Sequence, residues 1–125
     1  GNGSQSIFLD NIYFWRIPPA PTTAAPTPTY PAADVISIYS DAYTNVAGTD
    51  FNPNWGQSGF GTAAQVSIGG NNTRFYPNFN YQGIQIGSNQ NLTGFQFLHL
   101  DYYSANAGTL NVFLICPPGS PGGQA

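Results

Sequence analysis

The sequence predicts an all-β fold, a β-sandwich or jelly roll, from three observations. Residues that build exposed helix faces are scarce, because the chain has no Lys, no Glu and only two basic and five acidic residues. Thr, Asn, Ser, Gly, Tyr and Phe, which suit strands and turns, take their place. Clusters of Gly, Asn and Ser interrupt the apolar runs about every ten residues, a spacing typical of sandwiches. We therefore expect no helix of normal length.

Composition divides the chain into four regions. Residues 1–16 end in an apolar run, residues 17–33 are a Pro/Thr-rich linker, residues 34–116 form the β-sandwich body, and residues 117–125 are a disordered Pro/Gly tail. Within the body, strands are expected over residues 34–39, 63–68, 73–76, 82–86, 95–103 and 109–116. Turns are expected at residues 69–72, 87–89 and 104–108.

The amino-terminal run is apolar on both faces of an extended strand. One face carries Ile7, Leu9, Tyr13 and Trp15, and the other carries Phe8, Ile12 and Phe14. Such a strand is expected to be covered on both sides, because an uncovered one is prone to edge pairing. The linker, if extended as polyproline II at ~3.1 Å per residue, could reach ~50 Å. The strand can therefore return to its own body or enter a neighbouring molecule, and the long stiff linker favours the neighbour.

Charge and hydrophobicity exclude several partner classes. The net charge is −3 and Arg16 and Arg74 are the basic residues, so neither nucleic acid nor an anionic membrane is an expected partner. No apolar run approaches the ~20 residues that span a bilayer, and a signal sequence, if the protein is exported, has been removed. The lone cysteine, Cys116, is expected to be a small buried hydrophobe, with an intermolecular bridge as the alternative.

The sequence does not predict an enzyme. His99 and Asp101 fall on one face of a predicted strand and could orient a base, but the chain offers no nucleophile elbow, second His or Glu to complete a site. The expected role of His99 is a hydrogen bond to its neighbours within the strand.

Metal and sugar sites are possible interpretations of two polar regions. Asp10, Asp41 and Asp50 lie among oxygen-rich residues that could hold a structural calcium ion, although carboxylates in such loops usually cap turns. Trp55, with Tyr43 and Tyr76, could stack on a polysaccharide; alternatively, Trp55 plugs one end of the sandwich.

Glycosylation is expected from two patterns. Asn-x-Ser/Thr sequons begin at Asn2, Asn71 and Asn91. The linker resembles an O-glycosylated stalk, with Thr22, Thr23, Thr27 and Thr29 as acceptors. Glycans would help a nearly uncharged surface to stay soluble.

Two segments, DVISIYSDAYTNVAGTDFNPNWGQ (34–57) and NFNYQGIQIGSNQNLTGFQFLHLDYYSANAGTLNVFLI (78–115), resemble the opening two-thirds of a galactose-binding-like jelly-roll module of secreted bacterial proteins. GNGSQSIFLDNIYFWR (1–16) is similar to the closing strand of the same module, although here it comes first and the segment that precedes it in the family is absent. The resemblance implies an incomplete sheet with a groove that matches the terminal strand. It also implies that Asp10, with Asp41, would hold a structural calcium ion.

These observations lead to two expected functions. The first is a structural subunit of an extracellular, pilus-like filament, in which the strand of one copy completes the sheet of the next, as in pilin assembly. Such a head-to-tail contact does not close on itself and gives a helical polymer at the cell surface. The second is a secreted carbohydrate-binding module, with residues 5–16 folded back into their own sheet.

Overall fold

The computed structural model describes residues 9–14, 20–56 and 62–116. The chain divides into two units, Pro21–Tyr102 and a second that combines Gly1–Ala20 with Tyr103–Ala125. The predicted tail (117–125) and the outer parts of the predicted donor strand (5–8 and 15–16) lie outside the described residues. Over the three described ranges, no helix has the length and apolar character needed to cross a membrane.

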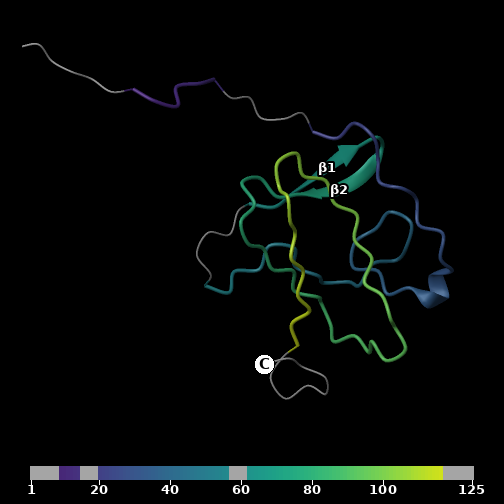
Figure 1. The fold of residues 1–125 in the computed structure, drawn as a ribbon. Coiled ribbons are helices and arrows are strands. Elements are labelled where there is room, and N and C mark those ends of the chain that lie inside the picture. Colours follow the sequence, from purple (N-terminus) through teal and green to yellow (C-terminus); the bar gives the residue numbers. More distant parts are fainter. Residues whose placement is uncertain (1–8, 15–19, 57–61, 117–125) are drawn as a thin grey trace, which may run out of the picture. The chain divides into compact units, whose positions relative to one another are not determined.

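One antiparallel hairpin is the regular sheet of the described residues. Strand β1 (Ala64–Ile68) pairs with β2 (Asn71–Phe75), in a register from Ala64 opposite Phe75 to Ile68 opposite Asn71 (Figure 1). Gly69 and Gly70 connect the strands with φ angles of 58° and 86°. Two positive φ angles define the tight turn whose twist suits a two-residue hairpin loop, and glycine adopts them without strain.

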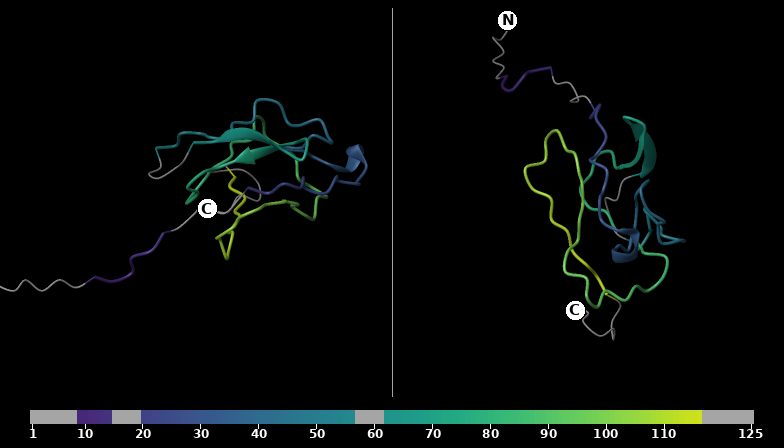
Figure 2. Two further views of the ribbon diagram at one scale, coloured as in Figure 1. Left: turned by 90° about the horizontal axis from the view of Figure 1, so that it is seen from above. Right: turned by 90° about the vertical axis from the view of Figure 1, so that its right-hand side faces the viewer.

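The hairpin confirms the strands predicted at 63–68 and 73–76. The second strand begins at Asn71, two residues earlier than expected. The reason is that Gly69 and Gly70 complete the reversal alone, so Asn71 and Asn72 join the ladder instead of the turn. Figure 2 shows this twisted hairpin from two further sides.

The strand predicted over 34–39 is not formed. A three-residue 3-10 helix, η1 (Ala32–Asp34), begins the segment, where the Asp34 amide donates to the Pro31 carbonyl at 2.9 Å. The only pairing described beyond it is an isolated bridge between Ser37 and Asn45. The predicted strand at 82–86 is likewise reduced to a bridge, in which Gln85 exchanges two backbone hydrogen bonds of 2.8 Å with Asp50.

The two longest predicted strands, over 95–103 and 109–116, are not formed either. In the Pro21–Tyr102 unit, the backbone of residues 96–102 makes no hydrogen bond with other described backbone of that unit. In the second unit, residues 109–116 likewise make none with the described backbone of theirs. A strand exists only through a partner's donors and acceptors, which explains why apolar alternation alone does not produce one here.

The described residues are therefore mostly non-helical and hold one small antiparallel sheet, consistent with a β-rich fold. They contain no buried hydrophobic side chain. The buried polar residue is Ser37, whose hydroxyl donates to Asn45 Oδ1 at 2.6 Å. Side-chain hydrogen bonds and half-buried rings thus provide the contacts within the Pro21–Tyr102 unit.

Candidate functional site

Trp55 lies on the backbone of a neighbouring segment. Its indole Nε1 donates to Gln85 Oε1 at 3.1 Å, and its ring packs against Gly83, where an added Cβ would come within 2.6 Å of Cη2. The bridge between Asp50 and Gln85 holds the two segments together. The Trp55 residue is 48% exposed. This arrangement can serve as a stacking platform beside the Gln85 amide.

Tyr76 belongs to the same neighbourhood, but its role is structural. Its hydroxyl donates to the Phe51 carbonyl at 3.0 Å, and Gln82 Nε2 donates to the same carbonyl at 3.4 Å. Burial raises the pKa of Tyr76, an effect that the Arg74 charge partly offsets. The Tyr76 hydroxyl therefore serves to hold the loop at Phe51 by this hydrogen bond.

Tyr43 lies elsewhere in the unit. Its hydroxyl donates to the Tyr30 carbonyl at 2.9 Å and so joins the body to the Pro/Thr-rich segment. Of the three aromatic residues predicted to bind sugar, the structure brings Trp55 and Tyr76 to the segment 82–83 and places Tyr43 on a different contact.

Sequence reasoning missed the role of Arg74. Its guanidinium carbon lies 4.0 Å from the Phe51 ring centroid and 4.8 Å from that of Tyr39, and the two rings meet edge to face at 5.3 Å. Arginine stacks favourably on aromatic faces. The signal was available, because Arg74 is the one basic residue of an aromatic-rich body.

The three predicted metal ligands each accept a local hydrogen bond. Asp41 accepts from the Asn72 amide at 2.6 Å and from Asn72 Nδ2 at 2.9 Å, and these two donors lower its pKa. Asp50 accepts from the Asn52 amide at 2.8 Å, and Asp10 accepts from the Asn11 amide at 2.7 Å. Among the residues described, no three His, Cys, Asp or Glu side chains gather as a metal site. The calcium ion stays a prediction from sequence.

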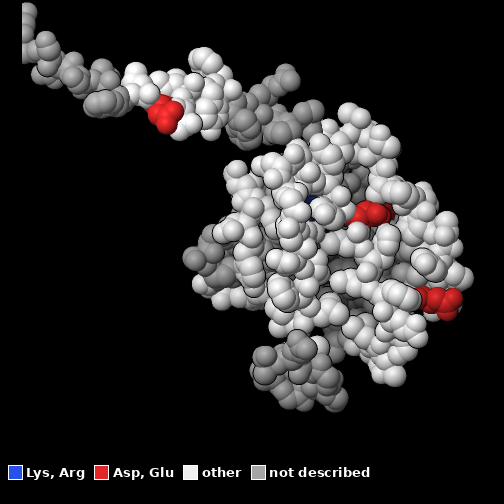
Figure 3. Space-filling model, in the orientation of Figure 1, with Lys and Arg blue, Asp and Glu red and all other residues white. Residues whose placement is uncertain are grey.

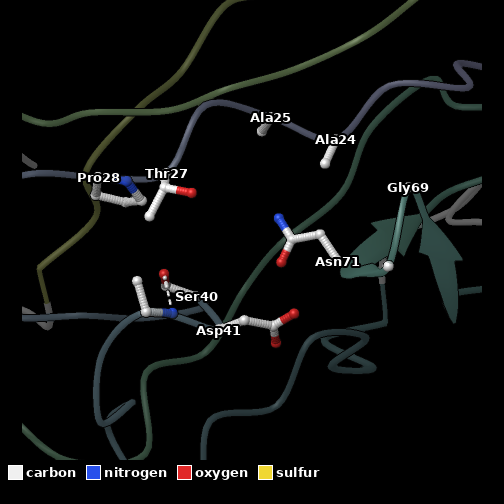
Figure 4. Close-up of a pocket in the computed structure, with 10 residues that line it drawn as sticks. Ala24, Ala25, Thr27, Pro28, Ser40, Asp41, Gly69 and Asn71 are labelled. Carbon is white, nitrogen blue, oxygen red and sulfur yellow. Dashed lines mark hydrogen bonds between the residues drawn. The ribbon is translucent and has the colours of Figure 1, made fainter.

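A cavity of about 290 Å³ lies between the Pro/Thr-rich segment and the body (Figure 4). Its walls are Ala24, Ala25, Thr27 and Pro28 on one side and, on the other, the loop 40–42 and the hairpin turn 69–71. Figure 4 shows Asp41 and Asn71 extending from the body toward this space.

His99 and Asp101 pair, although the strand predicted over 95–103 is not formed. His99 Nε2 lies 3.1 Å from Asp101 Oδ2, and the His99 side chain is 73% exposed. The pair lies on the open segment 96–102 and takes no part in lining the described cavity.

Large apolar side chains are exposed in both units. Leu9, Ile12, Tyr13 and Phe14 of the predicted donor strand are each at least 70% exposed, and Ile7, Phe8 and Trp15 lie outside the described residues. In the segments 95–103 and 109–116, Phe97 is 90% and Phe113 is 78% exposed. The exposed large hydrophobic residues of these two segments are Phe95, Phe97, Leu98, Leu100, Tyr102, Tyr103, Val112, Phe113, Leu114 and Ile115. Charge is rare on the face drawn in Figure 3.

The predicted glycan acceptors lie in different settings. Asn91 is exposed in a turn, where its Oδ1 accepts from the Thr93 amide at 3.0 Å. Asn71 is half-buried in β2 at the cavity wall, and Asn2 lies outside the described residues. The four linker threonines, Thr22, Thr23, Thr27 and Thr29, are exposed.

Comparisons of this chain with family models, curated proteins and solved structures found no match. The resemblance to galactose-binding-like jelly rolls therefore stays a prediction from the sequence.

Proposed function

We propose that this chain is a structural subunit of an extracellular, glycosylated filament, assembled head to tail by insertion of residues 5–16 into the next subunit. The observation that carries the proposal is that two parts of the described chain both lack a partner that would cover their apolar side chains. The segment 9–14 exposes apolar side chains. The segments 96–102 and 109–116 also expose apolar side chains, and their backbone is unpaired by the described backbone of their own units.

Strand addition would pair the open backbone and bury the exposed apolar side chains in one step. Backbone donors and acceptors of an open segment would pair with the incoming strand, and alternate side chains would become buried. Burial of apolar surface contributes about 25 cal/mol per Å², and exposed patches of this kind mark interaction sites. In this proposal the added strand completes the β-sandwich or jelly roll, and repeated addition produces a polymer at the cell surface.

The test is the assembly state of the purified protein and of two variants. Ile12→Asp places a carboxylate in the buried strand, which costs about 3 kcal/mol or more and weakens each joint on the order of 100-fold. Asn11→Asp adds the same charge at a neighbouring position that is already polar. Electron microscopy and light scattering should show filaments for the parent and Asn11→Asp, and monomers for Ile12→Asp.

Two outcomes contradict the proposal. The first is a parent protein that remains monomeric at every concentration, which would indicate that the strand returns to its own sheet. The second is equal assembly of parent and Ile12→Asp, which would place the joint elsewhere.

The Trp55 platform supports a second candidate function, a carbohydrate-binding module. An aromatic residue that is 48% exposed, beside the amide of Gln85, is suited to stacking on a sugar ring. Trp55→Ala should abolish binding on a polysaccharide array. Phe75→Ala, which removes an aromatic residue that is 50% exposed, should retain binding. Absence of binding by the parent, or unchanged binding by Trp55→Ala, rules this function out.

A further inference from the structure

The Pro/Thr-rich segment makes a close contact with the hairpin turn. A Cβ added to Gly69 would lie 2.8 Å from the Ala24 amide nitrogen and 3.3 Å from the Ala24 Cβ. The two backbones therefore approach as closely as glycine allows. The adjacent Gly70 has nothing within 4 Å of the same position.

A second contact holds the other end of the segment. The Tyr43 hydroxyl donates to the Tyr30 carbonyl at 2.9 Å. Between the two contacts, Thr27 and Pro28 face the loop 40–42 across the cavity of about 290 Å³ (Figure 4). The segment from Ala24 to Tyr30 is thus attached at both ends, and Pro21–Tyr102 forms one unit. The prolines of this segment already restrict its backbone, so that attaching it costs less conformational entropy.

We infer that residues 24–30 act as a fixed strap and not as a free tether, so that the joint between the donor strand and its own body is reduced to residues 17–23. A free linker over 17–33 reaches ~50 Å, whereas residues 17–23 reach only about 22 Å as polyproline II. Where the joint is used in assembly, which rests on the proposed function, neighbouring subunits are held close together and the filament is stiff.

Gly69 and Gly70 offer a matched pair of variants. Asparagine tolerates positive φ, and Asn-Gly is a favoured sequence for this turn. Gly69→Asn therefore preserves the hairpin but places its Cβ against Ala24. Gly70→Asn adds the same side chain where the structure leaves open space. The two variants differ in whether they displace the strap.

Spin-label mobility tests the strap without any filament. The label is placed at Thr23→Cys, in a chain that also carries Cys116→Ser and the monomer-forming Ile12→Asp. We expect restricted motion in the parent and in Gly70→Asn, and motion several-fold faster in Gly69→Asn. Fast motion in the parent, or equal motion in the two glycine variants, overturns the inference.

Subunit spacing tests the consequence for assembly. In electron micrographs, Gly69→Asn filaments should show a longer and more variable axial repeat and greater flexibility than Gly70→Asn filaments. An unchanged repeat in Gly69→Asn overturns the short joint while leaving the filament in place. If neither variant nor the parent forms filaments, the proposed function fails, and the label mobility still decides whether the strap is fixed.

Discussion

Asp41 and Asn72 connect the loop 40–42 to strand β2 through two hydrogen bonds, although 31 positions separate them in the sequence. Arg74, two residues further along β2, stacks on Phe51 and Tyr39. Both contacts use polar groups where most domains of this size use buried aliphatic side chains. At the scale of single residues, the Pro21–Tyr102 unit is therefore sensitive to changes in charge.

Asp41→Asn should make stability less dependent on acid pH. The backbone and side-chain donors of Asn72 hold the pKa of Asp41 below its ordinary value of 3.8. The charged carboxylate therefore favours the folded state above pH 3.8, and this contribution is lost as the pH falls through the lower pKa of the folded state. The parent should melt at a higher temperature than Asp41→Asn at pH 6, and the difference should close below pH 4.

Asn72→Ala provides the control for this prediction, because it removes the side-chain donor and keeps the backbone donor. Its melting temperature should depend on pH to a degree between those of the parent and Asp41→Asn. Parallel curves for all three proteins between pH 2.5 and pH 6 would show that the Asp41 contact does not stabilise the fold.

At the scale of elements, the hairpin differs from the other predicted strands because its partner is local. Gly69 and Gly70 bring β1 and β2 together within two residues. The segments 34–39 and 82–86 have no partner joined to them by so short a turn: Ser37 bridges to Asn45, eight positions away, and Gln85 bridges to Asp50, 35 positions away. Loop closure over longer separations costs more entropy. Sequence separation does not explain why 95–103 and 109–116 form no strand, because only five residues lie between them.

The close crossing of loops 47–49 and 86–87 should be as sensitive to an added side chain as a pair of strands is. A Cβ added to Gly87 would collide with the Ala47 carbonyl oxygen and lie 2.5 Å from the Gly48 carbonyl carbon. The Gly87 amide donates to Thr49 Oγ1 at 3.3 Å across the same crossing. Gly87→Ala should therefore lower the free energy of unfolding by about 1–3 kcal/mol, the usual cost of overpacking.

Gly108→Ala is the matched substitution, since a Cβ there has nothing within 4 Å. It should leave stability unchanged or raise it by up to about 1 kcal/mol, because it restricts the unfolded chain. Urea denaturation of both variants in the monomeric Ile12→Asp background measures the difference. Equal midpoints would mean that loops 47–49 and 86–87 do not cross closely in solution.

At the scale of the whole molecule, exposed apolar side chains occur in both units and no hydrophobic side chain is buried among the described residues. A chain in this state should respond strongly to a partner that covers those side chains. The monomeric Ile12→Asp protein should bind a hydrophobic dye such as ANS. A synthetic peptide of residues 5–16 should displace the dye and stabilise the protein by about 2.7 kcal/mol at 100 times its dissociation constant.

The same peptide carrying Ile12→Asp is the control, and it should neither displace the dye nor stabilise the protein. If the unmodified peptide leaves both the dye signal and the melting temperature unchanged, the body has no groove for this strand. Such a result would favour the carbohydrate-binding alternative centred on Trp55.

Parts of the fold and of the candidate site were predictable because they depend on neighbours in the sequence. The hairpin follows from two alternating runs around Gly69-Gly70, and the contact between His99 and Asp101 follows from their spacing of two. The platform beneath Trp55 was not predictable, since Gly83 is 28 positions away and its small size is informative only once the ring is known to lie against it.

By itself the sequence predicted that the chain has no long helix, which holds over the described residues, and that strands at 63–68 and 73–76 form a hairpin. It also predicted that the apolar amino-terminal run has to be covered. These properties come from local backbone preference and from composition. Only the tertiary structure decided that Ala24 lies against Gly69, that Tyr43 holds Tyr30 and that Arg74 stacks on Phe51. The physical reason is that each of these contacts joins backbone segments whose paths must first be set, and no local preference of Ala, Tyr or Arg specifies those paths.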